Sequence, residues 1–296
     1  RGEGKDPALL ALLAKQAMLA MTTKLAMQAL LALENWGGIM PVLAICNQKG
    51  GVGKTSTTLN LAASLARSNQ SVLIVDADSQ ANATDALGVE VNESTLTLND
   101  ALVAVANDTQ ADGIATETIV STSWEGIDLV PSERKLASRE MDTSLGRERL
   151  MGRALEGLEN KYQWILIDCP PALGPLSIGA LTAADGALIV TQPRAFSVAG
   201  VLEIVNTINA VKQYYNTGLE ITGIILNCWR SDRLDRAVWR DALREALPGC
   251  LIEHYLPERE IVATATTNRV PVPKNEAREY VNAMDAIARE LQGKLL

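Results

Sequence analysis

A glycine-rich loop near residue 50 constrains the fold of this chain more than any other feature. The run Asn47-Gln48-Lys49-Gly50-Gly51-Val52-Gly53-Lys54-Thr55-Ser56 follows an apolar segment, Val42–Cys46, and leads into a segment with helical spacing, Thr55–Arg67. Its glycines let the backbone wrap closely around a phosphate group, with several N–H groups pointing inward. The positive end of the following helix adds to the attraction for an anion. A strand, this loop and a helix in that order predict a phosphate-binding site.

The loop ends in two residues that suit a nucleotide bound together with a metal ion. Lys54 would reach the β and γ phosphates, and the Thr55 hydroxyl would bind Mg²⁺. The other residues expected to cradle the phosphates are Gly50, Gly51, Val52, Gly53 and Ser56. A glycine turn that only resembles a phosphate-binding loop is the competing interpretation, but the flanking strand and helix disfavour it.

Beyond Pro41 apolar runs alternate with helical stretches, and this alternation predicts the fold class. Short runs that are apolar on both faces are typical of strands in a parallel sheet covered by helices. The predicted strands are Val42–Cys46, Val72–Val75, Trp164–Ile167, Ala187–Val190, Ile221–Leu226 and, at an edge, Leu251–Tyr255. We therefore predict an α/β fold with a doubly wound, mostly parallel sheet and helices on both faces, as in P-loop nucleotide hydrolases. Ligands bind such sheets at the carboxyl ends of the strands, so the loops after Cys46, Val75 and Ile167 should form the site.

Residues 1–39 differ from the rest of the chain because Ala, Leu and Met dominate them. Asp6-Pro7 is a typical helix start, and Gly37-Gly38 is a typical stop and a flexible linker. We predict one long, apolar helix from about residue 8 to residue 35, whose lysines disfavour a membrane span. The chain then divides into residues 1–39, either a fused segment or a genuine extension, and a nucleotide-binding domain over residues 40–296.

Composition disfavours several classes of function. The chain has 296 residues, of which 47% are hydrophobic and 21% charged, so we expect a sizeable core and no wholesale disorder. The formal net charge is −8, so any contact with DNA must come from a local basic patch. The four cysteines are widely separated, which favours buried thiols in a reducing cytosol over a zinc or disulfide framework. The single histidine, His254, disfavours a histidine-based metal site or a Ser-His-Asp triad.

The loop departs from the common GxxxxGK[ST] pattern in an informative way. Gln48 stands at the first glycine position, and Lys49 is a second lysine beside it. Lys49-Gly50-Gly51-Val52-Gly53-Lys54-Thr55 resembles the deviant Walker A motif of the ParA/MinD family of ATPases. Asp76-Ala77-Asp78-Ser79-Gln80-Ala81-Asn82-Ala83-Thr84 resembles the second motif of that family, with serine in the usual proline position. Ile165-Leu166-Ile167-Asp168-Cys169-Pro170-Pro171 resembles its Walker B segment, and the motifs occur in the order that the family has.

The resemblance implies a role for each matching residue. Lys49 would cross a dimer interface and touch the nucleotide of the other subunit. Asp78 would position the attacking water, and Asp168 would support Mg²⁺ through water. Asp76 would support the loop and the metal shell, and Asn227 would recognise adenine. ATP and Mg²⁺ are the implied cofactors, and each aspartate has the alternative role of a strand-end cap.

The end of the chain bears on the branch of the family. The last segment, 286–296, has neither an aromatic residue nor a basic cluster, which disfavours docking on a membrane. Cys169 has no suitable partner in sequence to hold an iron–sulfur cluster, which disfavours the nitrogenase iron-protein branch. The chain therefore looks most like the ParA-type ATPases of plasmid and chromosome partition. That resemblance implies a homodimer on ATP, nonspecific binding of duplex DNA, a ParB-like activator, slow unaided hydrolysis and a cytoplasmic, nucleoid-associated location.

The candidate DNA-binding patch follows Asn227. The arginines expected there on one helix face are Arg233, Arg236, Arg240 and Arg244, with Arg230 just before the helix. Ion pairs from Asp232 to Arg236 and from Asp241 to Arg244 would instead make this a solvated helix, and both interpretations stay open. The segment Leu256–Ile261 is acidic around one arginine, which weakens it as a DNA contact, whereas Arg269 joins the candidates.

Two functions compete with an ATP-dependent DNA partition ATPase. One is an ATP-switched structural assembly or filament-forming protein with little DNA binding, in which residues 1–39 contribute to packing. The other is a P-loop biosynthetic enzyme with a small-molecule co-substrate. Lys49 disfavours the enzyme, because such an enzyme does not need a site shared across a dimer.

Overall fold

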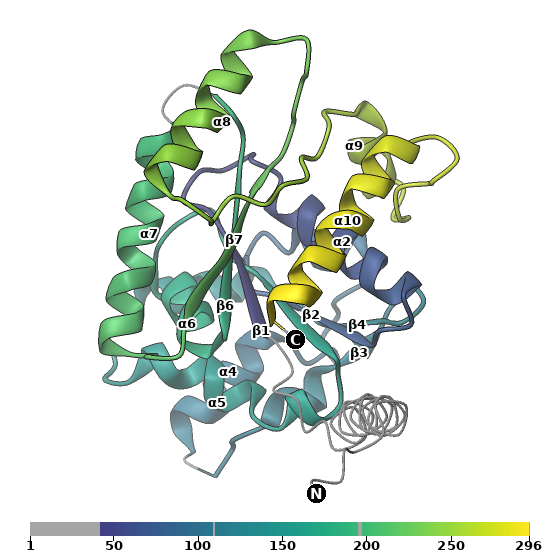
Figure 1. Ribbon diagram of the computed structural model, residues 1–296. Helices are drawn as coiled ribbons and strands as arrows, with labels where there is room; N and C mark the ends of the chain where they lie inside the picture. Colours follow the sequence, from purple (N-terminus) through teal and green to yellow (C-terminus); the bar gives the residue numbers. More distant parts are fainter. Residues whose placement is uncertain (1–41, 109, 195–196, 296) are drawn as a thin grey trace, which may run out of the picture. The chain divides into compact units, whose positions relative to one another are not determined.

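The structure is a computed structural model, and it describes residues 42–108, 110–194 and 197–295 (Figure 1). The predicted N-terminal helix and its glycine linker lie outside these residues. Within them the sheet has the strand order β3-β4-β2-β5-β1-β6-β7. Its strands are β1 (Val42–Cys46), β2 (Val72–Asp76), β3 (Val120–Ser121), β4 (Ile127–Val130), β5 (Trp164–Asp168), β6 (Gly186–Thr191) and β7 (Glu220–Leu226). Neighbours are parallel except β3 with β4, so the predicted doubly wound, mostly parallel sheet is confirmed.

The central strands explain why this sequence forms a two-sided sheet. All the residues of β2, β5 and β6 are buried, as expected for strands that read as continuous apolar runs. β5 lies between β1 and β2, and its last residue, Asp168, is in register with Ile45 on one side and Asp76 on the other. The carboxyl ends of these three strands therefore meet at one edge, where the predicted motifs end.

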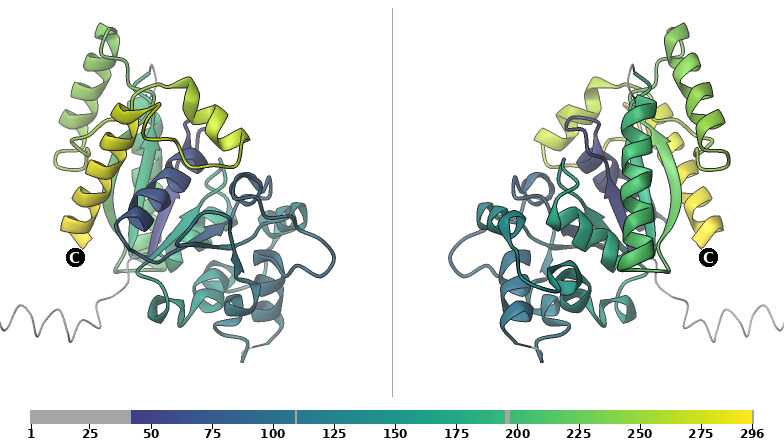
Figure 2. Two further views of the ribbon diagram at one scale, coloured as in Figure 1. Left: turned by 90° about the vertical axis from the view of Figure 1, so that its right-hand side faces the viewer. Right: turned by 90° about the vertical axis from the view of Figure 1, so that its left-hand side faces the viewer.

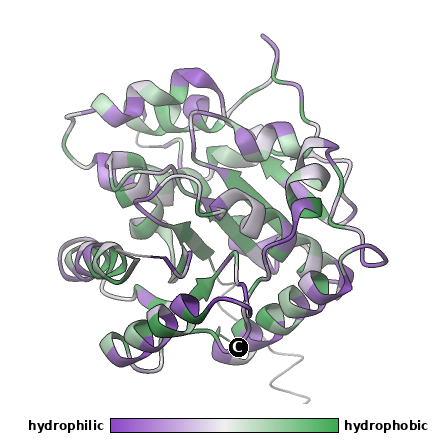
Figure 3. Cartoon of the chain, turned by 90° about the horizontal axis from the view of Figure 1, so that it is seen from above, coloured by the Kyte–Doolittle hydropathy of each residue, from purple (hydrophilic) through white to green (hydrophobic). Residues whose placement is uncertain are grey.

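Helices cover both faces of the sheet and enclose two cores (Figures 1 and 2). One core packs β-strand residues against α4 (Leu98–Asn107), α5 (Leu150–Leu155), α6 (Pro175–Ala183), α7 (Ser197–Tyr214) and Leu243 of α8 (Leu234–Ala246). The other packs the opposite face against α2 (Lys54–Arg67), α3 (Asn82–Ala86), α9 (Glu260–Thr267) and α10 (Arg278–Leu295). Figure 3 shows the result from above, with the strands hydrophobic and the helices polar on part of their surface. The alternation predicted from the apolar runs is the alternation observed.

Short helical turns fill the long connections. The 3₁₀ turns are η1 (Ile114–Thr118), η2 (Arg134–Met141), η3 (Arg147–Arg149) and η4 (Leu158–Asn160). The strands β3 and β4 were not predicted. Among the described residues, none of the helices is both long and apolar enough to cross a membrane.

The predicted edge strand at Leu251–Tyr255 does not form, and the prediction was wrong. Only Leu251 makes a bridge, to Ile224 of β7, with Ile252 N–H donating to the Ile224 carbonyl at 3.0 Å. The next amide, that of Glu253, donates to the Glu290 carboxylate of α10 at 3.2 Å instead. The ladder with β7 is therefore interrupted after Ile252, and the chain bonds β7 again at Leu256, whose N–H donates to the Leu226 carbonyl at 2.9 Å.

Candidate functional site

Two glycines give the phosphate loop its shape. The φ angle is +72° at Gly51 and +92° at Gly53, in the left-handed region where other residues are strained. Space excludes a side chain at the second position as well, since a Cβ atom on Gly53 would lie 2.1 Å from Asn227 Nδ2. The loop between β1 and α2 can therefore keep its backbone N–H groups close around a phosphate only with glycine at these positions.

Side chains from the neighbouring strands brace the loop. The Gln192 amide, just after β6, donates to the Gly51 carbonyl at 3.0 Å. The Asn227 amide, just after β7, donates to the Val52 carbonyl at 2.8 Å. Because both carbonyls point away to these partners, the braces fix the loop from the side opposite β5.

Lys54 and Thr55 begin α2 and face the end of β5. Lys54 is 7% exposed, and its ammonium lies close enough to Asp168 to lower the pKa of that carboxyl. The Thr55 hydroxyl donates to Asp168 Oδ2 at 2.6 Å, and the Thr58 hydroxyl, one turn later, donates to Oδ1 at 3.1 Å. A hydroxyl and a carboxylate beside a phosphate cradle are hard oxygen ligands of the kind that Mg²⁺ prefers.

The described residues fit a metal ion that is held mainly by a nucleotide. Within the ranges that the structure describes, no group of three or more His, Cys, Asp or Glu side chains forms a metal cage. Mg²⁺ in nucleotide sites usually takes one or two protein oxygens, the phosphates and several waters. Thr55 and Asp168 would hold the ion as that small number of protein ligands, a role that stays a prediction.

Asp76 braces the segment that carries Asp78. Asp76 Oδ2 accepts hydrogen bonds from the Thr84 backbone N–H at 2.8 Å and the Thr84 hydroxyl at 2.7 Å. Its other oxygen accepts from the Asp78 N–H at 3.2 Å. The Asp78 carbonyl in turn accepts from the Ser132 hydroxyl at 2.7 Å. Asp76 thus acts as the cap of a strand end and holds the segment after β2, and the support of the phosphate loop and metal shell that the resemblance implied stays a prediction.

Burial shapes the electrostatics of these carboxyls. Burial, and then the negative charge of Asp168, raise the pKa of Asp76 from 3.8 to about 7. Burial also raises the pKa of Asp168 to about 6, although Thr55, Thr58 and Lys54 act to lower it. A bound cation favours the ionised form of a nearby carboxyl. A positive charge that joins the two carboxyls would therefore favour their ionised forms, most of all that of Asp76.

A cavity of about 360 Å³ opens beside the phosphate loop, in the size range of ligand pockets. Gly53, Asn227 and Tyr280 are among the residues that line it. The Asn227 side chain holds the loop and also accepts the Cys228 N–H at 2.9 Å. Asn227 therefore borders this cavity, with its amide bonded to the backbone, and its recognition of adenine stays a prediction.

Lys49 is placed quite differently from Lys54. Its backbone N–H donates to Asn47 Oδ1 at 2.8 Å, and the Asn47 amide donates to the Val190 carbonyl at 2.5 Å. The base of Lys49 is thus anchored, while the residue itself is exposed. One loop therefore presents a buried cation to its own site and an exposed cation to its surroundings.

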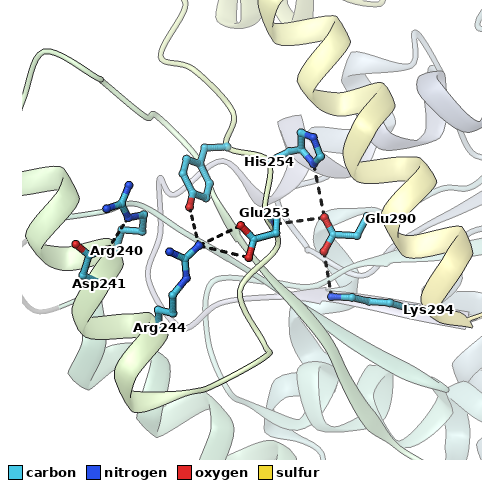
Figure 4. A network of polar contacts seen from close by, with 8 residues as sticks. Arg240, Asp241, Arg244, Glu253, His254, Glu290 and Lys294 are labelled. Atoms are coloured by element: carbon cyan, nitrogen blue, oxygen red, sulfur yellow. Dashed lines mark hydrogen bonds and ion pairs between the residues drawn. The ribbon is translucent and has the colours of Figure 1, made fainter.

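The candidate DNA-binding arginines of α8 are largely engaged within the chain. Arg240 donates to Asp241 at 2.7 Å, and its guanidinium lies 5.7 Å from the centre of the Trp229 ring. Arg244 donates to Glu253 at 3.1 Å (Figure 4). The expected pair between Asp241 and Arg244 is therefore replaced by contacts to other elements.

The arginines before and inside the first turn of α8 are also engaged. Arg230 pairs with Asp232 at 3.0 Å, so the expected pair between Asp232 and Arg236 was wrong. Arg236 instead donates to the backbone carbonyl of Pro193. That contact ties α8 to the loop after β6.

Two candidates remain outside this group. Arg269, at φ +58°, pairs with Asp85 at 2.6 Å, and its carbonyl accepts the Trp124 indole N–H at 3.0 Å. Arg233 is exposed at the N-cap of α8, and within the described part of the chain no ion pair involves it. Within the described residues, neither Arg233 nor Arg236 forms an ion pair; Arg236 is half-buried and bonds a carbonyl, so Arg233 is the more exposed of the two unmatched charges.

Several side chains that shape the site were not predicted from the sequence. Thr58 lies three residues after Thr55 on the same helix face, so helical spacing offered a signal for it. Gln192 and Ser132 reach the site from loops that are distant in sequence, and no local pattern points to them. Their contacts depend on the order of strands in the sheet.

The fold and the site define a class of protein. The sheet is mostly parallel, and the loop after β1 holds a buried lysine and a second, exposed lysine. The threonine that follows the buried lysine bonds the aspartate that ends β5. These features define a P-loop nucleotide-binding protein of the deviant Walker A type.

Comparisons with known proteins refine that class. A family model described as an AAA domain matches residues 40–221. Sporulation initiation inhibitor protein Soj of Bacillus subtilis (strain 168) is 40% identical over 187 residues, covering 62% of this chain and 71% of Soj. Chromosome partitioning protein ParA of Caulobacter vibrioides (strain NA1000 / CB15N) is 36% identical over 236 residues, covering 78% of this chain and 85% of ParA. An ATP complex of McdA from Cyanothece matches with a TM-score of 0.76 at 26% identity, covering 87% and 98% of the two chains.

These likenesses establish the family. The chain belongs to the ParA/MinD family of P-loop ATPases. The resemblance inferred from the three motifs is therefore confirmed.

Proposed function

We propose that this chain is an ATP-driven partition or positioning ATPase that works as an ATP-bound dimer. The observation that supports it most is the arrangement of two lysines on one phosphate loop, with Lys54 buried beside Asp168 and Lys49 exposed. Relatives named for chromosome partitioning and sporulation control, and a structural neighbour crystallised with ATP, point to the same role. ATP and Mg²⁺ would occupy the loop, with Lys54 on the β and γ phosphates and Thr55 on the ion.

Hydrolysis would use the side chains gathered at the strand ends. Water attacks the γ phosphorus while the bond to the bridging oxygen breaks, which yields ADP and phosphate. Asp78 would orient the water, and Lys54 with Mg²⁺ would neutralise the developing charge. The partner subunit's Lys49 would add a further positive charge, as an arginine finger does in trans.

This arrangement would make ATP a switch for assembly. A nucleotide that binds the dimer but not separate subunits stabilises the dimer by mass action, and its hydrolysis removes that stabilisation. The dimer would bind duplex DNA without sequence preference, and a ParB-like activator would accelerate hydrolysis and release it. A location on the nucleoid would follow from that DNA binding.

An Asp78→Ala variant tests the switch. It should bind ATP and Mg²⁺, hydrolyse ATP slowly and remain dimeric, because only the group that orients the attacking water is lost. Sedimentation of the full chain with ATP and Mg²⁺ would show a lasting dimer, while wild type returns to monomer as ATP is consumed. Glu93→Ala, an exposed carboxylate far along the same connection, should behave like wild type. An Asp78→Ala chain that binds ATP yet stays monomeric would rule out the proposed switch.

The engaged arginines of α8 favour a second candidate, an ATP-switched assembly protein with little DNA binding. Retention of the ATP-bound chain on duplex DNA at moderate salt separates the two candidates, with the ADP-bound chain as control. Nucleotide-dependent retention would favour partitioning. Growth of light scattering with ATP but no retention would favour assembly.

A further inference from the structure

Helix α6 begins without a capping side chain of its own. Its N-cap residue is Gly174, and no side chain of the N-cap position bonds the first turn. The first N–H groups of a helix need acceptors from elsewhere. The Glu140 carboxylate, from η2, lies against Gly174 at this end of the helix, and the N–H of Leu176 in the first turn acts to lower the pKa of that carboxyl. Glu140 is therefore placed to supply, from another element, the acceptor that the cap position lacks.

Gly174 and Glu140 fit one another closely. A Cβ atom on Gly174 would lie 2.1 Å from Glu140 Oε2 and 3.0 Å from its Cδ. The backbone of Gly174, at φ −84° and ψ −174°, is extended and open to any residue. An alanine at this position would therefore push the Glu140 carboxylate aside, without straining the backbone of residue 174 itself.

The segment that this contact holds leads straight into the nucleotide site. Residues 169–174 connect Asp168 to α6, and Pro171 packs on the phosphate loop, 3.7 Å from where a Cβ on Gly50 would lie. The Ser177 hydroxyl of α6 donates back to the Ala172 carbonyl. The segment is therefore fixed at one end by β5 and at the other by the first turn of α6.

Glu140 also lies within the electrostatic field of the site. Burial raises the pKa of Glu140, and the charge of Asp78 raises it further, while the Leu176 N–H acts in the opposite sense. Only a carboxylate close to Asp78 would feel its charge in this way. Glu140 thus contacts the start of α6 and lies within reach of the charge of Asp78.

We infer that Glu140 is a positioning residue for ATP hydrolysis, which holds the first turn of α6 so that residues 169–174 keep their place over the phosphate loop. The inference rests on the proposed ATPase function. Glu140 would not touch ATP, because it acts through the backbone of α6. Its loss should therefore affect turnover far more than nucleotide binding.

Substitutions at both partners of the contact, made in the full chain, test the inference. Glu140→Ala and Gly174→Ala should each lower kcat about 10- to 100-fold, as displaced catalytic geometry does, while the Kd for ATP stays within about 3-fold of wild type. Glu140→Gln should retain most of the turnover, because its amide oxygen can still accept the Leu176 N–H. Gly200→Ala on α7, where an added methyl meets no atom within 4 Å, is the matched control and should be silent.

The double variant gives the sharpest readout. In the Glu140→Ala background the three atoms nearest to a Cβ at position 174 are gone, so adding Gly174→Ala should cause little further loss of kcat. Thermal melting of each variant checks the fold. Glu140→Asp withdraws the carboxylate by one methylene and should lower kcat for the same reason, but less than Glu140→Ala does.

Three outcomes decide the matter. The role of Glu140 would be overturned if Glu140→Ala turned over ATP within about 2-fold of wild type. It would also be overturned if Gly174→Ala lowered kcat equally in the wild-type and Glu140→Ala chains. Non-additive loss of kcat with ATP affinity retained would establish it. A wild-type chain that binds ATP but never hydrolyses it, even with an activator, would instead overturn the proposed function.

Discussion

At the scale of single residues, the two lysines of the phosphate loop lie five positions apart in sequence but differ in exposure and therefore in the role that each can have. Lys54 begins α2, is 7% exposed and lies beside Asp168. Lys49 sits before the first glycine of the turn, with its amide bonded to Asn47 and its side chain in solvent. Burial makes the first lysine part of its own site. Exposure leaves the second available to another molecule.

The two lysines should therefore fail differently when removed. Lys54→Ala should weaken ATP binding about 100-fold, because it loses charge-assisted contacts with phosphate of about 2 to 3 kcal/mol. Lys49→Ala should bind ATP within about 3-fold of wild type but hydrolyse it about 1000-fold more slowly, since a cation supplied in trans acts in the transition state. Equilibrium binding and steady-state turnover of both variants measure this, with the exposed Lys161→Ala as control. Normal turnover in Lys49→Ala would exclude a shared site.

At the scale of elements, the strands that position the site were predicted from their apolar runs alone. The run Val42–Cys46 is β1 as predicted, while β2 and β5 each extend one residue further, to Asp76 and Asp168. Strands buried on both faces have few polar interruptions, so their limits are visible in the sequence. Because the phosphate loop and both aspartates adjoin these strands, the centre of the site was predictable as well.

Elements with weaker patterns were not predictable. β4 spans only Ile127–Val130, and the polar Asp128 interrupts its apolar run. The Tyr162 hydroxyl donates a hydrogen bond to the Asp128 carboxylate at 2.8 Å, which accommodates the charge within the strand. Glu140 and Gln192 act on the site across long separations in sequence, so only the assembled sheet brings them there. Tertiary contacts of this kind have no local signature in a single sequence.

Helix α8 shows a further limit of reasoning from spacing. The helix forms as predicted, over Leu234–Ala246, but Asp241 of the same helix pairs with Arg240, and Glu253 from outside the helix pairs with Arg244. Its most exposed side chains include the apolar Leu234 and Val238, at 88% and 64% exposure. Helical spacing predicts which arginines share a face. Their ion-pair partners in the folded chain determine which of those arginines can still contact DNA.

The arginines of α8 should therefore contribute unequally to DNA binding. Arg233→Ala should weaken binding of the ATP-bound chain to all sequences alike and reduce the salt dependence by about one unit of slope, as expected for one lost phosphate contact. Arg240→Ala should change neither, because that guanidinium is already held by Asp241 and Trp229. Binding isotherms at several salt concentrations would show the difference. Equal losses in both variants would mean that the contacts of Arg240 open on DNA.

At the scale of the whole molecule, the buried carboxyls of the site make the stability of the nucleotide-free chain depend on pH. Unfolded aspartates titrate near 3.8, whereas the folded pKa is about 7 for Asp76 and about 6 for Asp168. Between these values the folded chain binds more protons than the unfolded chain, so its stability must decrease as the pH rises. Asp285, whose pKa Ser64 and Arg67 lower despite burial, acts with the opposite sign and at lower pH.

The free energy of unfolding should therefore fall between about pH 5 and about pH 8, by at most about 1.4 kcal/mol per pH unit for each retained proton. Urea unfolding without nucleotide or Mg²⁺ across that range measures the slope. Asp76→Asn should flatten it, because the variant lacks the proton that is retained to the highest pH. Mg²⁺ with ATP should flatten it too, since the cation favours the ionised carboxyls. Asp235→Asn, at an exposed position of α8, should leave the slope as it is. A wild-type slope that is flat or rising would contradict the raised pKa values and, with them, the view that this site is completed by a cation.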